Sequence, residues 1–208
     1  MLILASASPR RRELLTQAGF AFQVCPADIA EDRQPDEEPV AYVTRLAREK
    51  AQAVFLRQTA IAEHAGSVAA DSDLVVLGAD TTVVLDDRIL GKPEDAADAV
   101  RMLRLLSGCS HRVITGIAVV TAQSTQIASE ETAVRFLPLS DAEIEAYVAT
   151  GEPMDKAGAY GIQGRAARWI PRIEGCYFNV VGLPLALVSS LLAGCKGVSE
   201  RPEGNPED

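Results

Sequence analysis

Apolar residues occur along the chain in short runs separated by polar segments rich in glycine, proline or acidic residues, a pattern typical of a domain with many short elements. Runs rich in β-branched side chains predict strands at residues 2–5, 20–24, 74–78, 82–85, 113–120, 126–136 and 177–181. The runs 113–120 and 126–136 are spaced as a hairpin. The sequence GADT separates 74–78 from 82–85, so Asp80 is expected at the end of a buried strand or in a turn between two strands.

Capping residues and apolar spacing predict five helices. Ser8 followed by Pro9 is a helix start, and Ser140 with Glu143 forms a capping box for a helix that ends near residue 148. A long helix from Pro39 carries one apolar stripe at three- and four-residue steps, formed by Val40, Val43, Leu46, Ala47, Ala51 and Val54. Two more helices are expected at 95–106 and 183–192, and loops at 28–38, 63–72 and 151–164.

Strands and helices mix without strict alternation, which predicts an α/β fold with a mixed, twisted central sheet flanked by helices. A chain of 208 residues with 48% hydrophobic residues can form a sizeable core. We expect a single domain over residues 1–195. Residues 196–208 are polar and contain proline, so they are expected to form a disordered tail.

The net charge of -9 disfavours a general nucleic-acid binder, because phosphate backbones require a broad basic surface. A few cations in one cleft can still hold a small phosphate ligand. The four cysteines form no C-x-x-C pair, and with two histidines in the chain a zinc site is not expected. The apolar run at the start of the sequence is followed by three arginines too soon to be a signal peptide or a membrane span. These features predict a reduced, cytoplasmic protein without a membrane partner.

The segment from Ser6 to Arg12 combines two serines, a helix N-terminus and three arginines. Arginines at this end oppose the helix dipole, and every polar group in the cluster is a hydrogen-bond donor. A phosphate chain would supply the missing acceptors. The alternative is a capped surface helix with solvated arginines.

Asp80 stands in an apolar stretch, where a carboxylate is a candidate metal ligand or general base. Lys92, held between a glycine and a proline, is a candidate phosphate ligand or a solvated loop lysine. Glu31 and Lys50 lie in charged segments that are usually solvated. In the glycine-rich segment 154–164, the Asp155-Lys156 pair offers charge, and the amide of Gln163 can donate to and accept from the edge of uracil or thymine. The alternative there is a tight loop without a ligand, and the sequence contains no P-loop.

In this order the segments resemble the Maf family of nucleoside triphosphate pyrophosphatases over residues 2–192. The matching strings are LASASPRR, Glu31 in the acidic loop, LAREKA around Lys50, GADT, GKP, DKAGAYGIQG and VVGLPL. The resemblance implies two lobes around a cleft, cleavage between the α- and β-phosphates, a divalent cation such as Mg²⁺ or Mn²⁺, and a homodimer. The loop before residue 74 looks longer than is usual in the family.

The resemblance also implies a role for each matching residue. Asp80 would be the proton acceptor, with Glu31, Asp80 and Asp155 as metal ligands. The phosphates would be bound by Ser8, Arg11, Lys50, Lys92 and Lys156. Substrate choice would depend on Arg10, Thr81 and Gln163.

The string AYGIQG is similar to the subgroup that hydrolyses dTTP and UTP. Two alternatives stay open. One is hydrolysis of 7-methyl-GTP or another modified nucleotide, and the other is a non-enzymatic nucleotide-binding regulator of septum formation. Binding to nucleic acid is the least favoured.

Overall fold

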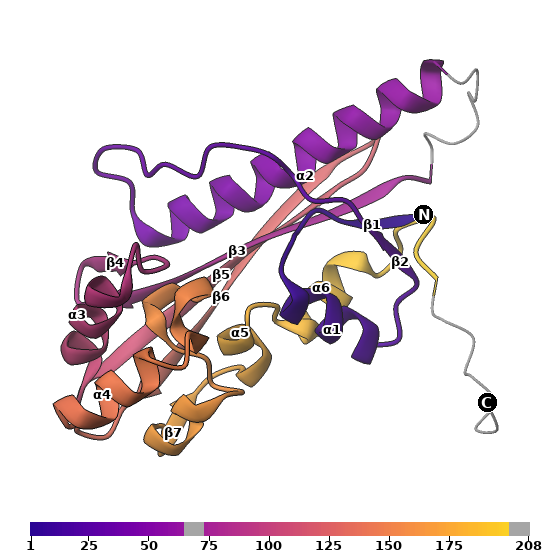
Figure 1. Cartoon of the computed structure of the whole chain (residues 1–208). Coiled ribbons are helices and arrows are strands. Elements are labelled where there is room, and N and C mark those ends of the chain that lie inside the picture. The colour runs from indigo at the N-terminus through magenta and orange to yellow at the C-terminus, as the bar shows by residue number, and fades with distance from the viewer. Residues whose placement is uncertain (65–72, 200–208) are drawn as a thin grey trace.

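A computed structural model describes residues 1–64 and 73–199 of the chain. A mixed seven-stranded sheet runs through it in the order β2-β1-β3-β5-β6-β7, and β4 pairs with β3 (Figure 1). β1 is parallel to β2 and β3, whereas the other pairs are antiparallel. The strands are β1 (Leu2–Leu4), β2 (Phe22–Val24), β3 (Val75–Leu85), β4 (Arg88–Leu90), β5 (Ser110–Val120), β6 (Thr125–Arg135) and β7 (Arg172–Glu174).

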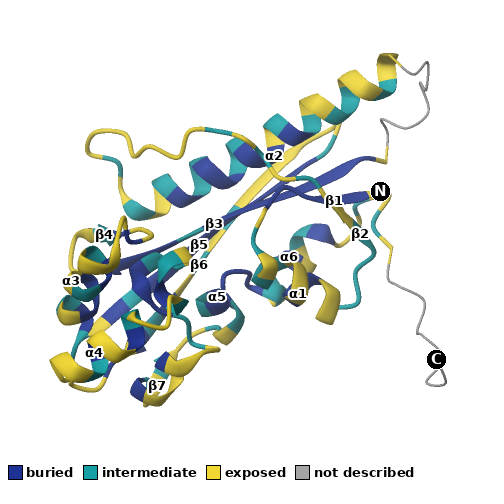
Figure 2. Cartoon of the chain, viewed as in Figure 1, coloured by how far each residue is buried: buried dark blue, intermediate teal, exposed yellow. Residues whose placement is uncertain are grey.

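Helices cover both faces of this sheet, which confirms the expected α/β class (Figure 1). α2 (Pro39–His64) packs its apolar stripe against the residues of β3 that point to one face. α1 (Pro9–Gln17) and α6 (Leu185–Leu192) pack against the alternate residues of β3 on the other face. Figure 2 shows α2 as an amphipathic helix whose buried stripe faces the sheet.

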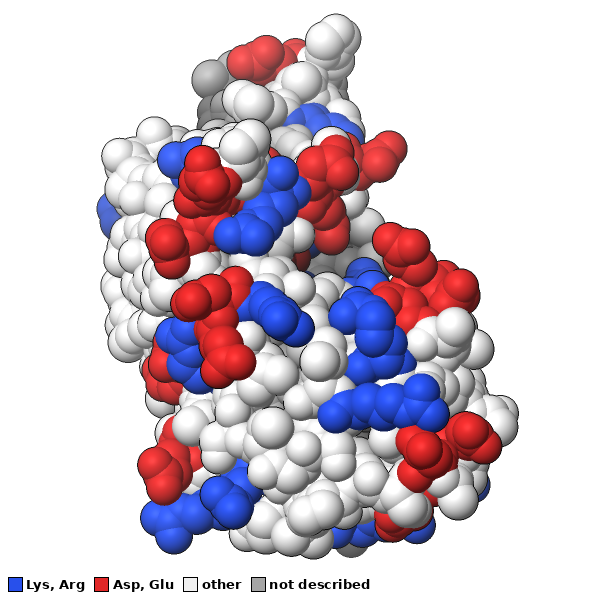
Figure 3. All heavy atoms as spheres, turned by 90° about the vertical axis from the view of Figure 1, so that its left-hand side faces the viewer, with Lys and Arg blue, Asp and Glu red and all other residues white. Residues whose placement is uncertain are grey.

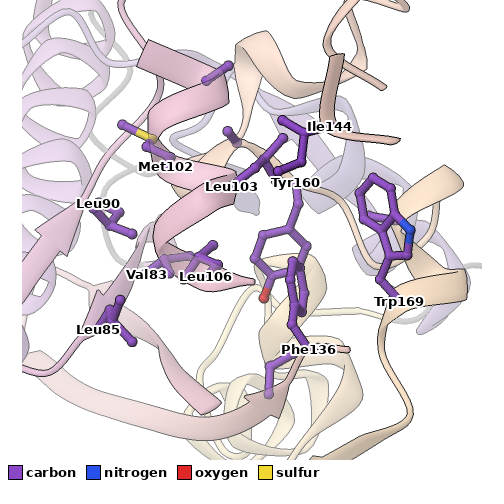
Figure 4. Close-up of a cluster of buried hydrophobic side chains, with 14 of the residues drawn as sticks. Val83, Leu85, Leu90, Met102, Leu103, Leu106, Phe136, Ile144, Tyr160 and Trp169 are labelled. Atoms are coloured by element: carbon purple, nitrogen blue, oxygen red, sulfur yellow. The ribbon is translucent and has the colours of Figure 1, made fainter. Parts of the chain in front are cut away.

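A second group of elements packs around one end of the long strands. It contains α3 (Ala96–Leu106), α4 (Asp141–Val148), β4, β7 and the 3-10 turns η1 (Glu152–Asp155), η2 (Ala157–Ala159) and η3 (Arg165–Trp169). Their shared core includes Leu103, Phe136, Ile144, Tyr160 and Trp169 (Figure 4). A pocket lies between these two groups of elements. β3, α1 and α2 form one of its sides, and the 3-10 turns form the other.

Two glycines let α2 approach the sheet closely. A Cβ atom at Gly78 of β3 would overlap the carbonyl oxygen of Ala47, and one at Gly116 of β5 would overlap the backbone of Val43. Neither glycine has a positive φ, so glycine is required here because a side chain has no room, and not because of the backbone conformation. The close packing brings Lys50 of α2 over β3.

The structure corrects the expectation for residues 74–85. Residues 75–85 form one continuous eleven-residue strand, β3, and Asp80 lies in its middle, paired with Gly116 of β5. The low strand propensity of aspartate is overridden here because β5 pairs with β3 on both sides of Asp80. Residues 86–87 form the turn that connects β3 to β4.

The expected strand at 177–181 is wrong. These residues form the short helix α5 (Tyr177–Val181), and the preceding strand β7 was not expected. A short apolar run does not distinguish a strand from a buried helical turn. The buried amide of Asn179 fixes the helix by donating to Val113 O at 2.9 Å and to Thr132 Oγ1 at 2.9 Å.

Three other boundaries differ from the expectation. Helix α2 continues to His64, so the expected loop at 63–72 starts too early, and its residues 65–72 lie outside the described residues. The glycine-rich segment 151–164 contains the turns η1 and η2. Of the expected tail, Ser199 O accepts a hydrogen bond from Ala21 N at 2.9 Å, and residues 200–208 lie outside the described part. No helix in the described part is long and apolar enough to cross a bilayer.

We predict that Gly78→Ala destabilises the protein by roughly 1–3 kcal/mol, because the new methyl group forces α2 away from β3. Urea unfolding followed by circular dichroism measures the change. Gly91→Ala is the matched control, since no atom lies within 4 Å of the added Cβ. Equal stability of the two variants would contradict the close packing of α2.

The buried imidazole of His111 predicts a loss of stability in acid. Burial lowers the pKa of His111 to about 4, and its Nδ1 has no hydrogen-bond partner among the described residues, so the folded state favours neutral histidine. Because the unfolded chain takes up the proton near pH 6.5, stability is complete above that pH and falls as the pH drops toward 4, by roughly 3 kcal/mol.

Thermal unfolding at pH 7 and pH 5 measures this loss in the wild type and in a His111→Phe/Tyr160→Phe double variant. Tyr160 is changed as well because its hydroxyl lies 2.8 Å from His111 Nε2. The double variant should lose less stability between the two pH values than the wild type. An identical loss in both proteins would show that His111 does not cause it.

Candidate active site

A pocket of about 700 Å³ lies between the sheet, the start of α1, α2 and the 3-10 turns. Its wall contains all eleven residues that the sequence singled out: Ser8, Arg10, Arg11, Glu31, Lys50, Asp80, Thr81, Lys92, Asp155, Lys156 and Gln163. Figure 3 shows Lys and Arg side chains gathered beside a hollow on one face of the molecule, with acidic side chains above it. Segments far apart in the sequence therefore meet at one charged cavity.

A buried lysine joins two carboxylates in this pocket. Lys50 Nζ lies 2.6 Å from Asp80 Oδ1 and 2.7 Å from Glu31 Oε1. The side chains of Lys50 and Asp80 are 9% and 12% exposed, whereas that of Glu31 is 50% exposed. A buried ammonium group and a buried carboxylate need such pairing, because desolvation of either charge alone is costly.

The two carboxylates have opposite pKa shifts. Burial raises the pKa of Asp80, and the charges of Lys50 and Arg11 oppose that rise only in part. For Glu31, burial alone would raise the pKa, but the hydrogen bond from Lys50 and the charges of Lys50, Lys92 and Arg11 outweigh it and lower the pKa. Asp80 is therefore the better proton acceptor of the pair.

Arg11 is engaged by the protein itself. Its Nε donates to Gly182 O at 2.8 Å, one terminal nitrogen donates to Ala79 O at 2.9 Å and Ser6 Oγ at 3.2 Å, and the other donates to Thr81 Oγ1 at 2.9 Å. Burial lowers the pKa of Arg11 from its very high ordinary value. The guanidinium group thus ties α1 to β3 and to the turn after α5.

Ser8 acts as the expected N-cap of α1, and its hydroxyl accepts from Arg11 N at 3.5 Å. Arg10 reaches across the pocket, where its NH1 donates to Asp155 Oδ2 at 2.8 Å. Lys156 Nζ donates to the other oxygen, Asp155 Oδ1, at 2.6 Å. Partial burial would raise the pKa of Asp155, but these two cations outweigh it and hold the pKa at about 2.

The three expected metal ligands do not form one cluster. Asp155 is bound by Arg10 and Lys156, whereas Glu31 and Asp80 meet at Lys50. Within residues 1–64 and 73–199, no group of three His, Cys, Asp or Glu side chains is arranged to hold a metal ion.

Lys92 and Gln163 differ from the other pocket residues. In the described part of the chain, neither side chain has a hydrogen bond or an ion pair to another residue. Lys92 raises the local positive potential, as its effect on the pKa of Glu31 shows. These two side chains are free to contact a ligand.

Sequence reasoning missed the contacts that hold the acidic loop 28–38 over the pocket. Tyr42 donates to Glu31 O at 2.9 Å, and Arg45 Nε contacts Glu37 Oε1 at 2.6 Å. The same arginine donates to Asp32 O at 3.0 Å. Arg45 lies eight residues after Glu37, so their spacing in the sequence does not indicate that they pair. The only available signal for this contact was a basic side chain near the start of the helix that follows the acidic loop.

Comparison with known proteins gives one family. Residues 1–195 match the family described as Maf-like protein. A protein of Symbiobacterium thermophilum named dTTP/UTP pyrophosphatase is 53% identical over 184 residues, which cover 88% of each chain. Proteins with the same name from Geobacter sulfurreducens and Salmonella typhimurium are 53% and 50% identical, over 90% and 92% of this chain and 92% and 91% of their own. The chain belongs to the Maf-like protein family.

Proposed function

We propose that this protein is a nucleoside triphosphate pyrophosphatase that hydrolyses dTTP and UTP to the nucleoside monophosphate and pyrophosphate. The observation that carries the proposal is the convergence of Lys50, Lys92, Lys156 and Arg10 with the buried Asp80 in one pocket. A volume of about 700 Å³ lies in the usual range for small-molecule sites. The names of the relatives support the same substrates.

Phosphoryl transfer depends on positioning and on charge neutralisation more than on a covalent step. The pocket offers cations from four separate segments, and Lys92 has no competing partner in the described chain. The amides at the start of α1 add donors for phosphate oxygens. Arg11 contributes its charge and holds this wall in place.

The proposed reaction uses Asp80 as the general base. Asp80 takes a proton from a water molecule, whose oxygen forms a new bond to the α-phosphorus. The bond from the α-phosphorus to the oxygen bridging to the β-phosphate breaks, and pyrophosphate leaves with that bridging oxygen. Lys92 and Lys156 stabilise the charge that develops on the leaving group. The raised pKa of Asp80 strengthens it as a base.

A divalent cation fits the pair Glu31 and Asp80. Both carboxylates point at Lys50 Nζ, so they converge on one cationic position. Mg²⁺ is commonly bound by one or two carboxylates together with phosphate oxygens, which agrees with the lack of a three-residue cluster among the described residues. When bound, such a cation would neutralise phosphate charge and lower the pKa of water. Asp155 is the least supported of the three expected ligands because two cations already hold it.

We also propose a cytoplasmic location, supported by four cysteines that are all free thiols. The acidic net charge disfavours nucleic acid as a partner. The homodimer implied by the family resemblance stays a prediction.

We predict that a screen of nucleoside triphosphates with Mg²⁺ gives monophosphate and pyrophosphate, fastest from dTTP and UTP. Asp80→Asn should lower kcat by about 10²- to 10⁴-fold, because the amide cannot accept the proton. Pyrophosphate release measures both results, and Asp87→Asn, in the exposed turn after β3, is the matched control. Full turnover by Asp80→Asn would refute the assigned base, and faster release from 7-methyl-GTP would refute the substrate class.

Lys50→Met tests the cation position. The change leaves Asp80 and Glu31 facing each other without a positive charge, so it should lower the free energy of unfolding by roughly 2–3 kcal/mol. Mg²⁺ should stabilise the variant more than the wild type, because the cation replaces the missing ammonium group. Thermal unfolding with and without Mg²⁺ measures this, with Lys196→Met on the exposed surface as control. Equal Mg²⁺ effects on both proteins would contradict the proposed site.

A further inference from the structure

A tyrosine behind the pocket wall and a glutamate in that wall hold the loop that carries Gln163. Tyr147 of α4 is 2% exposed and does not line the pocket, whereas Glu152 at the start of η1 does. Tyr147 Oη donates to Glu152 Oε1 at 2.8 Å. The ring of Tyr147 packs edge-on against Trp169, with 5.1 Å between ring centroids.

Both ends of the loop are bound to this pair. Gly161 N donates to Tyr147 Oη at 3.3 Å, and Arg165 N donates to Glu152 Oε2 at 3.3 Å. These two backbone bonds enclose the segment of residues 161–165 and leave the side chain of Gln163 free. The backbone of the loop is therefore fixed while its one amide side chain faces the cavity.

The loop lies close to the side chains of Glu152 and Lys156. A Cβ atom at Gly164 would overlap the carboxylate of Glu152, and one at Gly161 would lie 2.8 Å from Lys156 Cε. Gly164 has φ -100°, a value open to any residue, so its φ does not require glycine. A side chain at position 164 would therefore push the Glu152 carboxylate away from its place beside the loop.

The same turn also anchors Arg10. Lys156 Nζ donates to Glu152 O at 2.6 Å and to Asp155 Oδ1 at 2.6 Å, and Asp155 Oδ2 accepts from Arg10 at 2.8 Å. Glu152 therefore connects the Gln163 loop to Arg10 through a continuous chain of hydrogen bonds. Two of the three side chains expected to determine substrate choice, Arg10 and Gln163, therefore have a common support.

We propose that Tyr147 and Glu152 are positioning residues for base selection: they fix the backbone that carries Gln163 relative to Arg10, so that its amide reaches the edge of the pyrimidine. This inference rests on the proposed function. Discrimination between bases by hydrogen bonds requires the reading group to lie at the right place, and a fixed backbone limits the positions that the amide can take. Uracil and thymine present an acceptor at O4 and a donor at N3, whereas cytosine presents a donor at its amino group and an acceptor at N3.

The test compares Tyr147→Phe with Tyr177→Phe. Phenylalanine fills the same space in the core, so the first variant removes only the hydroxyl, its hydrogen bond to Glu152 and the one that it accepts from Gly161 N. Tyr177 is 42% exposed, and its hydroxyl makes no hydrogen bond in the described part of the chain, which makes it the matched control. kcat and KM are measured for UTP and CTP with Mg²⁺, and thermal unfolding confirms that each variant is folded.

Tyr147→Phe should lower the ratio of kcat/KM for UTP to that for CTP by roughly 10-fold, mainly through a higher KM for UTP. Tyr177→Phe should keep the wild-type ratio. Gly164→Ala should lower the ratio as well, because its methyl group displaces the loop from Glu152. A purely structural role would reduce the rates with both nucleotides equally.

An unchanged UTP-to-CTP ratio in Tyr147→Phe, with the wild type selective, overturns this inference and leaves the proposed function standing. A wild-type protein that releases pyrophosphate from neither UTP nor dTTP overturns the proposed function and this inference with it. A lower ratio in both Tyr147→Phe and Gly164→Ala, with Tyr177→Phe unchanged, supports the assigned role.

Discussion

The site depends on one buried charge contact, in which the ammonium group of Lys50 lies between Asp80 and Glu31. Three separate segments must be placed correctly for this contact to form: helix α2, the middle of β3 and the acidic loop. Gly78 and Gly116 allow the helix to approach the sheet, and pairing with β5 keeps Asp80 in an unbroken strand. Because each charge in the contact is costly to bury alone, the contact favours the arrangement in which all three segments meet.

The two sides of the pocket are built in different ways. The side with α2 and β3 is regular secondary structure, which holds the carboxylates rigidly. The other side consists of 3-10 turns and glycine-rich loops, where Gly164 and Gly161 pack against Glu152 and Lys156. Phosphate chemistry is common to all nucleotides, whereas bases differ. The position of Gln163, the proposed base-reading residue, on the loop side agrees with this difference. Small sequence changes in a loop can reshape the surface without affecting the sheet.

Sequence patterns predicted most of the elements because their signals are local. The apolar stripe of α2, the capping box at Ser140 and the hairpin of β5 and β6 each depend on residues close together in the chain. Two assignments failed where tertiary contacts decide the outcome. Asp80 stays in a strand because of pairing with β5, and residues 177–181 form a helix around the buried amide of Asn179. The pocket residues were identified through family resemblance, and the structure brings them together. Tyr42, Arg45 and Tyr147 hold the segments that carry those residues and have no motif of their own.

The saturated guanidinium group of Arg11 has a consequence for how a ligand reaches the pocket. Its hydrogen bonds run to two carbonyl oxygens and two hydroxyl groups, none of which carries a negative charge. The positive charge therefore stays at a fixed position, and these neutral partners do not neutralise it. Its electric field extends into the cavity. Such a field draws a polyanion toward the opening before any contact forms, and it acts over a distance that dissolved salt shortens. On the proposed function, capture of the nucleotide and its retention would thus rely on different cations, with Arg11 guiding the approach and Lys92, which has no partner among the described residues, contacting the phosphates.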